Sequence, residues 1–245
     1  MPRELIRPTN PNLDIYDISS IATIAHEAGA TLVVDNAMGG PLVQRPLELG
    51  ADCVIYSATK HVDGQGRCLG GVVLASEDFI QSHVHDFLRQ TGPAISPFNA
   101  WVMLKSLETL PLRIAAQQTS ALKLADFLNK HEAVTRVIYP GQPSHPNYEL
   151  ANRQMKGGGT IVCFEVRDGK SGAFRLSNAL KVILLSNNFG DTKSILTHPL
   201  ITTHQRLSAE VRAELGITDG MLRLSVGLEA INDLKADLSN ALDAV

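Results

Sequence analysis

The sequence contains few cysteines, few aromatic residues and no long hydrophobic run, and these absences exclude several classes of protein. Three cysteines occur in 245 residues, and none forms a C-x-x-C pair. This usage does not indicate a disulfide scaffold; it favours a reducing, cytoplasmic location, and no metal site is predicted. No apolar stretch approaches the roughly 18 residues of a membrane-spanning helix. The first five residues lack the apolar core of a signal peptide, so no membrane association is expected.

An excess of positive charge is also missing. The chain has 22 lysines and arginines against 25 aspartates and glutamates, which gives a formal net charge of −3. This balance offers no basis for nucleic-acid binding. Hydrophobic residues make up 44% of the chain, and its length allows one large domain or two smaller ones with their own cores. We therefore expect a globular protein.

Apolar runs and helical patterns alternate in the first half of the chain. They predict helices at 14–29, 77–90 and 97–110, and strands at 31–35, 52–57 and 71–75. Such alternation predicts an α/β fold with a mixed, mostly parallel sheet that is covered on both faces. Sheets of this kind bind their ligands at the carboxyl ends of the strands.

A different pattern follows the long helix that is predicted to begin at Pro111 and end near Lys130. Later elements are predicted as strands at 134–139, 160–166 and 221–226 and a closing amphipathic helix at 229–244. We place a domain boundary within or just after the long helix, between residues 115 and 130. The predicted division is a partial large domain at 1–115 and a smaller α+β C-terminal domain at 116–245.

Lys60 lies directly after an apolar strand, in the segment Y-S-A-T-K-H at residues 56–61, and glycines follow at 64, 66, 70 and 71. The ordinary interpretation is an exposed, solvated lysine. The chemical interpretation is an amine whose pKa is lowered by burial and nearby cations, so that it can attack an aldehyde and move protons. A lysine that forms a Schiff base with pyridoxal phosphate needs these properties.

Asp35 ends the predicted buried strand at 31–35 and therefore lies at the same edge of the sheet as Lys60. A helix N-cap or a turn is the structural interpretation of such a residue. The functional interpretation is an ion pair with the ring nitrogen of pyridoxal phosphate. That pair keeps the ring protonated, so that it can accept electrons from a substrate.

Ser57 and Thr59 flank the lysine with two hydroxyl groups. They are either ordinary polar residues at the end of a strand or ligands of a phosphate group, where hydroxyls add donors beside backbone N–H groups. The glycines that follow allow a close approach of the backbone. Their spacing, G-x-G-x-x-x-G from residue 64, is not the dinucleotide-binding fingerprint and opens no helix.

Residues 57–60 also match S-x-x-K, the nucleophile motif of penicillin-binding enzymes. No S-D-N or K-T-G sequence follows, and the motif ends a strand, whereas those enzymes have it at the start of a helix. The interpretation as a pyridoxal-phosphate lysine is therefore favoured.

Arg223 is a charge inside the predicted strand at 221–226. A salt-bridged structural arginine is one interpretation. The other is a guanidinium fork that holds the carboxylate of a substrate.

Five motifs, in order along the chain, resemble those of the Cys/Met metabolism family of pyridoxal-phosphate enzymes, which comprises the trans-sulfuration enzymes. The motifs are P-T-N-P at 8–11, V-D-N at 34–36, S-A-T-K at 57–60, T-H-P and T-H within 197–204, and R-L-S-V-G-L-E at 223–229. The resemblance extends over essentially the whole chain from Pro8. It implies the aspartate-aminotransferase-like fold (fold type I), pyridoxal 5'-phosphate as the cofactor, Lys60 as its Schiff-base lysine and Asp35 at the ring nitrogen.

The resemblance implies further roles in binding an amino-acid substrate. Arg223 would hold the substrate carboxylate, and Asn10 would contact both that carboxylate and the phenolic oxygen of the cofactor. Asn188 stands where the family has a serine near the same carboxylate. Subunits of the family form homodimers that pair into homotetramers.

Two segments resemble the O-succinylhomoserine sulfhydrylases within this family: D-G-Q-G-R-C at 63–68 and N-F-G-D-T-K-S at 188–194, which is followed by T-H-Q-R-L-S at 203–208. This implies γ-replacement on a homoserine ester, with sulfide as the incoming group and homocysteine as the product. Cystathionine γ-synthase or γ-lyase activity on the same scaffold remains an alternative.

The N-terminal end departs from the family pattern. Arg7 stands where the family has Ser or Thr, and residues 1–7 do not resemble it. A preceding segment of the family supplies the aromatic residue that stacks on the cofactor ring and contacts to its phosphate. We therefore expect an N-terminally truncated chain that folds poorly and binds the cofactor weakly by itself, and a catalytically incomplete remnant is a further alternative.

Overall fold

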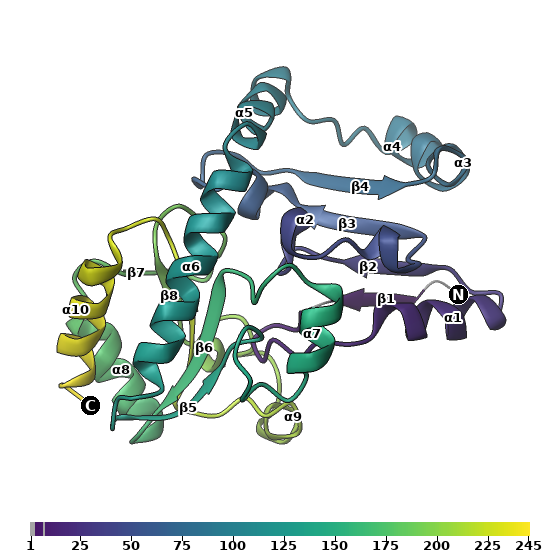
Figure 1. The fold of residues 1–245 in the computed structure, drawn as a ribbon. Helices are drawn as coiled ribbons and strands as arrows, with labels where there is room; N and C mark the ends of the chain where they lie inside the picture. Colours follow the sequence, from purple (N-terminus) through teal and green to yellow (C-terminus); the bar gives the residue numbers. More distant parts are fainter. Residues whose placement is uncertain (1–2, 7) are drawn as a thin grey trace.

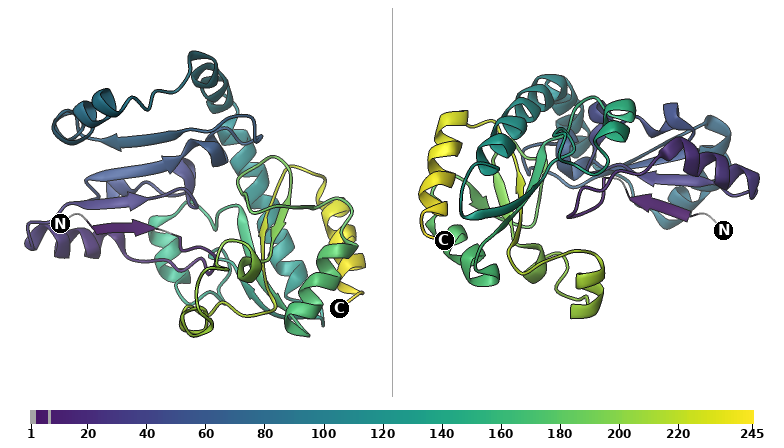
Figure 2. Two further views of the ribbon diagram at one scale, coloured as in Figure 1. Left: turned by 180° about the vertical axis from the view of Figure 1, so that it is seen from behind. Right: turned by 60° about the horizontal axis from the view of Figure 1, so that its bottom comes forward.

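Two β-sheets and a long helix between them organise the part of the chain that the computed structural model describes, residues 3–6 and 8–245 (Figure 1). Figure 2 shows the purple β1 and the yellow α10 at opposite ends of the molecule, with the long helix α6 in between. The departures from the family pattern expected at Met1, Pro2 and Arg7 lie outside the described residues.

The first sheet has the order β1-β2-β3-β4 among the described residues. Its strands are β1 (Arg3–Ile6), β2 (Leu32–Asp35), β3 (Cys53–Ser57) and β4 (Gly71–Ala75). The first three are parallel and β4 is antiparallel to β3. The sheet is therefore mixed and mostly parallel, as predicted, although β1 was not expected.

The helix α1 (Ile18–Glu27) packs on this sheet through Ile18 and Ala22. It begins four residues later than predicted because Asp17, and not Asp14, caps it by accepting a hydrogen bond from the backbone N–H of Ser20 at 3.0 Å. Two short elements follow β2, namely α2 (Gly40–Val43) and a 3₁₀ turn (Pro46–Leu49).

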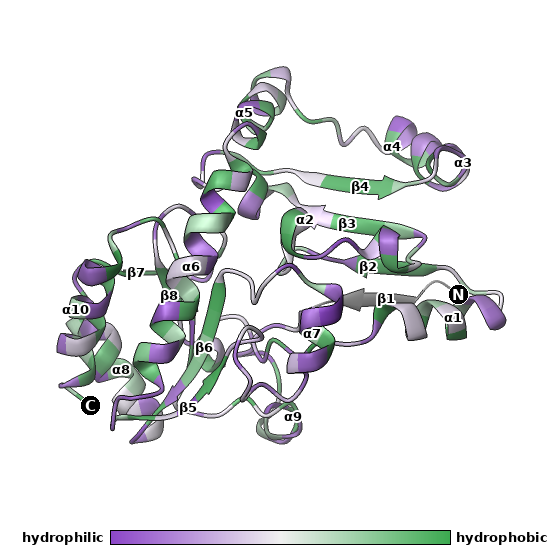
Figure 3. Cartoon of the chain, viewed as in Figure 1, coloured by the Kyte–Doolittle hydropathy of each residue, from purple (hydrophilic) through white to green (hydrophobic). Residues whose placement is uncertain are grey.

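The segment after β4 extends away from the sheet. Its elements are α3 (Glu77–Phe79), a π-helical stretch (Ile80–His85), α4 (Asp86–Thr91) and α5 (Pro97–Leu107). Many large apolar side chains between residues 69 and 112 remain exposed: Leu69, Val73, Leu74, Phe87, Leu88, Ile95, Phe98, Trp101, Leu104, Leu107 and Leu112. We call this set the exposed apolar surface; Figure 3 shows the hydrophobic strand β4 that forms part of it.

The helix α6 (Leu110–Leu128) links the two sheets and matches the predicted long helix closely. Its first turns bury Leu110 and Ile114 in a cluster with Val43 of α2. Its last turns bury Leu124 and Leu128 in the core of the second sheet. One continuous helix thus contributes to the core of the second sheet and to a separate cluster beside α2, and the boundary between residues 115 and 130 stays a prediction.

The second sheet has the order β5-β6-β9-β8-β7 among the described residues. Its strands are β5 (Val134–Ile138), β6 (Ile161–Val166), β7 (Leu184–Leu185), β8 (Ile195–Thr197) and β9 (Met221–Ser225). The apolar core under it is shared with α6 and with two further helices, α8 (Gly169–Ala179) and α10 (Ile231–Leu242). This is an α+β arrangement, as predicted for the C-terminal part.

Several elements of the second half were not predicted: α7 (Tyr148–Gln154), α8, β7, β8 and α9 (Ala209–Glu214). The two strands are only two and three residues long. The helix α8 contains two glycines and many polar residues, and it is held by the burial of Ala173 and Leu176 against the sheet. Tertiary packing, and not local propensity, fixes such elements. None of the helices described is long and apolar enough to cross a membrane.

A buried carboxylate connects α10 to the segment that leads into β7. Asp237 accepts hydrogen bonds from the backbone N–H groups of Lys181, Val182 and Ile183 at 2.8, 3.0 and 2.9 Å. Asp237→Ala should lower the free energy of unfolding by about 1–3 kcal/mol, because the N–H of Ile183 is buried and would lose its acceptor. Urea denaturation followed by circular dichroism measures this change.

Asp243→Ala is the matched control on the same helix. The Asp243 side chain is 71% exposed and lies 3.8 Å from Nε2 of His131, so the control should cost less than about 0.5 kcal/mol. Equal losses in the two variants would contradict the role given to Asp237.

Candidate active site

The carboxyl ends of β2 and β3 deliver the acid and the amine to one edge of the first sheet. Asp35 is the last residue of β2, and its Cα pairs with that of Ile55 in the parallel strand β3. The strand β3 ends at Ser57 and passes directly into a π-helical turn, Ala58–Val62, which we call the lysine turn. Lys60 interrupts this turn with a non-helical backbone, φ −88° and ψ −122°.

The amine of Lys60 faces the second sheet and not the first. Its Nζ donates a hydrogen bond to Oδ1 of Asn188 and lies 4.9 Å from the centroid of the Phe189 ring. Burial lowers the pKa of Lys60 below its ordinary value, and the charge of Arg223 lowers it further. Both effects favour the neutral amine, which is the nucleophilic and basic form.

Arg223 is 1% exposed and has no carboxylate partner within ion-pair distance among the described residues. Its Nη1 donates to Oδ1 of Asn10 at 2.8 Å, and its Nη2 donates to the carbonyl groups of Asn187 and Asn188 at 3.0 and 3.1 Å. The Nε atom is buried and has no hydrogen-bond partner. Burial lowers the pKa of Arg223. A buried guanidinium with a spare donor and no counter-ion is suited to bind an anion.

Asn10 enters the site from the loop that precedes α1. Its side chain accepts from Arg223, and its carbonyl oxygen is 3.1 Å from Nε2 of His204. Arg223 reaches it from β9, more than two hundred residues away in the chain. The structure thus brings together four of the predicted site residues: Lys60, Asn10, Asn188 and Arg223.

The other three predicted residues lie along the edge of the first sheet. Oδ1 of Asp35 accepts from the backbone N–H of Ala37 at 2.9 Å. The hydroxyl of Thr59 accepts from the N–H of Gly70 at 3.0 Å and donates to its carbonyl at 3.4 Å. These two hydrogen bonds connect the lysine turn to Gly70. Ser57 makes no side-chain cap to the lysine turn. The roles of these residues toward a cofactor stay predictions.

Phe189 was missed by the sequence analysis, although it is central to the site. Its ring is 8% exposed and lies 4.9 Å from Nζ of Lys60, 5.3 Å from the guanidinium carbon of Arg223 and 5.9 Å from the ring of His61. Both cations can therefore interact with the same π-system. A single aromatic residue in a loop gives no sequence signal of such a position.

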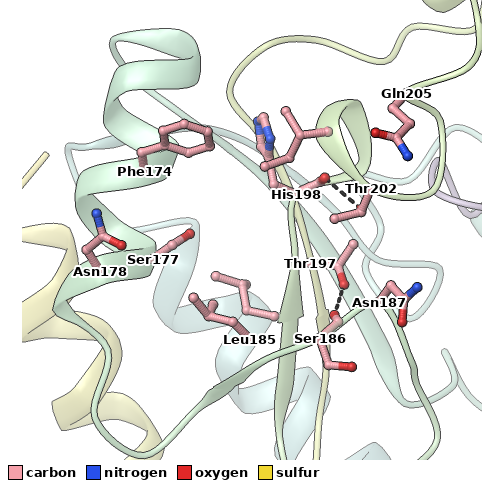
Figure 4. A pocket seen from close by; sticks show the side chains of 12 residues that line it. Phe174, Ser177, Asn178, Leu185, Ser186, Asn187, Thr197, His198, Thr202 and Gln205 are labelled. Atoms are coloured by element: carbon pink, nitrogen blue, oxygen red, sulfur yellow. Dashed lines mark hydrogen bonds between the residues drawn. The ribbon is translucent and has the colours of Figure 1, made fainter.

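A separate cavity of about 660 Å³ lies between α8 and the 3₁₀ turn Pro199–Ile201, and Phe174, Leu185, Asn187 and His198 are among the residues that line it. Figure 4 shows it from close by, with a hydrogen bond from Thr197 to the carbonyl of Ser186 drawn as a dashed line. Lys60 and Asp35 do not line this cavity. The cavity is therefore not lined by the amine or by the acid.

The side chains at the strand ends fit pyridoxal phosphate chemically. They comprise an amine with a lowered pKa, a carboxylate at the end of a parallel strand and two hydroxyl groups nearby. Beside them, the unpartnered Nε of Arg223 is available to an anionic substrate group. This is the set that a Schiff-base cofactor and an amino-acid substrate require.

Comparison with known proteins decides the family. A model of the Cys/Met metabolism PLP-dependent enzymes matches residues 5–243. The chain belongs to this family. The match confirms the predicted cofactor of the family, pyridoxal 5'-phosphate. It also confirms the connection of the family with methionine metabolism and trans-sulfuration.

Curated relatives include enzymes with different activities. The chain is 49% identical to the O-succinylhomoserine sulfhydrylase of Mycobacterium tuberculosis (strain ATCC 25618 / H37Rv) over 239 residues, which is 96% of this chain and 59% of the relative. It is 49% identical to the enzyme of the same name from Pseudomonas aeruginosa, covering 97% and 59%. A cystathionine γ-lyase of Dictyostelium discoideum is 43% identical, covering 96% and 61%. The chain thus spans about three fifths of the length of these relatives.

Solved structures confirm the predicted fold. The chain is similar to a cystathionine γ-lyase of Micromonospora echinospora with a TM-score of 0.96 and 35% identity, covering 100% of this chain and 64% of that one. A cystathionine γ-synthase of Xanthomonas oryzae pv. oryzae gives a TM-score of 0.96 and 36% identity, covering 99% and 63%. These Cys/Met-metabolism enzymes have the predicted aspartate-aminotransferase-like fold (fold type I).

The coupling between Arg223 and Lys60 can be measured. Because the charge of Arg223 lowers the pKa of Lys60, Arg223→Gln should raise that pKa, while burial continues to hold it below the ordinary value. The measurement is the pH dependence of acetic anhydride labelling at Lys60, followed by peptide mass mapping. The pH midpoint of labelling should rise in the variant.

Arg175→Gln is the control, since Arg175 is an exposed arginine on α8 that pairs with Asp168. It should leave the midpoint unchanged. A midpoint that does not move in Arg223→Gln would show that the two charges are not coupled.

Proposed function

We propose that the enzyme to which this chain belongs carries out γ-replacement on a homoserine ester, converting O-succinylhomoserine and sulfide to homocysteine and succinate. The observation that carries the proposal is the group formed by Lys60 and Arg223, an amine of lowered pKa beside a buried guanidinium with an unpartnered Nε. The 49% identity to O-succinylhomoserine sulfhydrylases supports this choice of activity.

Pyridoxal phosphate would supply an aldehyde that captures amino groups and a ring that accepts electrons from the substrate. Lys60 would hold the cofactor covalently, and Asp35 would lie against its ring nitrogen. Ser57 and Thr59 would donate hydrogen bonds to its phosphate, and Asn10 would contact its phenolic oxygen.

Arg223 would orient the substrate through its carboxylate. The guanidinium is already fixed by Asn10 and by two backbone carbonyl groups, so little side-chain freedom is lost on binding. Of its five N–H donors, Nε–H and one N–H of Nη1 are not used by these contacts and remain for the ligand. Asn188, in the loop between β7 and β8, would take part in binding the substrate. Its carbonyl accepts a hydrogen bond from Arg223, and its side chain accepts one from Lys60.

Lys60 would move the protons. Its Nζ is the base that takes the proton from the α-carbon of the substrate and later returns a proton, and the lowered pKa makes the basic form accessible. Phe189 covers the amine on one side and would exclude water from it. In the overall reaction the bond from Cγ to the ester oxygen breaks, a bond from Cγ to sulfur forms, and succinate leaves.

Cystathionine γ-synthase or γ-lyase activity is a second candidate, favoured by the 43% identity to a cystathionine γ-lyase and by the close structural match to a γ-synthase. Product analysis of the purified protein distinguishes the two. With O-succinylhomoserine we expect homocysteine when sulfide is added and little cystathionine when cysteine is added. Cystathionine as the main product, or release of a keto acid without any added thiol, would favour the second candidate.

A cytoplasmic location and assembly into homodimers and homotetramers are also proposed. The exposed apolar surface supports an assembly, because many large apolar side chains are exposed between residues 69 and 112, and exposed apolar patches commonly mark an interface. Sedimentation analysis of the purified chain tests this expectation.

Lys60→Ala should abolish covalent capture of the cofactor and reduce turnover to background. The purified chain is mixed with pyridoxal phosphate, its visible spectrum is recorded before and after borohydride reduction, and the site of the reduced adduct is mapped by mass spectrometry. In the wild-type chain the adduct should lie on Lys60.

Lys105→Ala is a control, because the Lys105 side chain is half-exposed on α5 and forms an ion pair with Glu108. It should retain both the spectrum and the adduct. An adduct on another lysine, or sulfhydrylation that persists in Lys60→Ala, would overturn the assignment. No adduct at all would show that residues 1–245 do not hold the cofactor and would contradict the proposed function.

A further inference from the structure

A buried histidine joins the segments on which the site depends. His61 follows Lys60 in the lysine turn and is 3% exposed. Its Nδ1 lies 3.3 Å from the carbonyl oxygen of Ala37, and its Nε2 lies 2.8 Å from the hydroxyl of Thr160. Neither ring nitrogen is left for a substrate.

The two partners fix the tautomer of the ring. A carbonyl oxygen can only accept, so the nitrogen that faces Ala37 must carry the proton. Nε2 is then the acceptor, and the hydroxyl of Thr160 donates to it. Burial, with the charges of Arg113 and Lys60 adding to it, lowers the pKa of His61 to about 4. The ring is therefore neutral near pH 7 and is held as one donor and one acceptor.

Each contact of the ring leads to a different part of the site. The carbonyl of Ala37 belongs to the residue whose N–H is bound by Asp35. Thr160 directly precedes β6, and its carbonyl accepts from Val226, which follows the strand of Arg223. A single imidazole thus connects the acid at the end of β2, the lysine turn and the sheet that holds the arginine.

The loop of Asn188 also packs closely on His61. The Phe189 ring lies 5.9 Å from the imidazole. Gly190 has φ +76°, and a Cβ on it would come within 2.8 Å of the backbone nitrogen of His61 and 3.1 Å of its ring. This glycine is therefore required both by its backbone angle and by the approach to His61.

The backbone of the lysine turn is held from its other side. Nη1 of the buried Arg113 donates to the carbonyl of His61 at 2.9 Å, and its Nη2 donates to that of Val62 at 3.2 Å. Hydrogen bonds thus hold both the side chain and the main chain of His61. The residue before it, Lys60, has a non-helical backbone.

We propose that His61 is a positioning residue: through its hydrogen bonds to Ala37 and Thr160 it fixes the lysine turn so that Nζ of Lys60 points to Asn188 and lies beside Arg223 and Phe189. The catalytic meaning of this position rests on the proposed function. The geometric claim concerns the chain without cofactor and can be tested there.

The test compares four variants by the pH midpoint of acetic anhydride labelling at Lys60 in the cofactor-free chain. His61→Phe keeps the ring volume and removes both hydrogen bonds, and His61→Gln keeps one donor and one acceptor. Thr160→Val removes only the hydroxyl that donates to Nε2, which is a milder change should His61→Phe fold poorly. His145→Phe is the matched control, because His145 is 5% exposed and its Nδ1 accepts from the N–H of Asn147.

The midpoint should rise in His61→Phe toward that of a solvated lysine, because a displaced Lys60 leaves its buried place beside Arg223. Thr160→Val should give a smaller rise, and His61→Gln should restore part of the wild-type value. His145→Phe should lower thermal stability without moving the midpoint. The dissociation constant of pyridoxal phosphate should rise about tenfold in His61→Phe, because the lysine that would hold the cofactor is displaced.

A midpoint that stays at the wild-type value in both His61→Phe and Thr160→Val, with only a loss of stability, would reduce His61 to a core residue and overturn the proposal. This failure differs from that of the proposed function. If wild-type Lys60 forms no reduced cofactor adduct while the midpoint still responds to His61, the function is wrong and the positioning role stands.

Discussion

The charge of Arg223, which is buried and has no carboxylate partner among the described residues, is the constraint on which the rest of the site depends. Taking a cation out of water without a counter-ion costs on the order of several kcal/mol. The fold offsets part of this cost with the amide of Asn10, two backbone carbonyl groups and the face of Phe189, but leaves Nε unsatisfied. A buried charge that costs this much free energy is useful where an anion is to be bound. The loop of Asn10 and the loop of Asn187 and Asn188 both contact the arginine for this reason.

The two sheets supply different kinds of precision. The parallel strands β2 and β3 have their carboxyl ends at the same edge of the sheet, and this places Asp35 and the lysine turn there. The pairing register of the two strands is sufficient for this placement. The second sheet supplies the arginine from a strand that is buried along its whole length, so the guanidinium is fixed by packing. Between them lie both apolar and polar contacts: Met38 packs in one cluster with residues of β6 and β9, and His61 bonds to Ala37 and to Thr160. The position of the amine relative to the guanidinium thus depends on apolar packing as well as on hydrogen bonds.

Sequence could predict what is determined locally. An apolar run that ends in a polar residue locates Asp35 and Lys60 at strand ends, and a charge within a strand singles out Arg223. Contacts between distant segments are another matter: Thr160 lies 99 residues from His61, and Asn188 lies 128 residues from Lys60. A buried neutral histidine such as His61 and a loop phenylalanine such as Phe189 belong to no sequence pattern that would predict their position in the site. Asn188 was assigned to the substrate carboxylate, and its hydrogen bond to the amine became visible only in three dimensions.

The two cations of the site also constrain each other. The charge of Arg223 lowers the pKa of Lys60, and Phe189 lies near both groups. A carboxylate bound to the guanidinium would cancel much of that charge and raise the proton affinity of the free amine. Linkage makes the effect reciprocal: a protonated amine must in turn tighten the binding of the carboxylate. The site therefore makes the lysine a stronger base when a substrate is in place and a weaker one when it is absent. A structural arginine with its own aspartate or glutamate could not do this, which is a physical reason for leaving Arg223 without one.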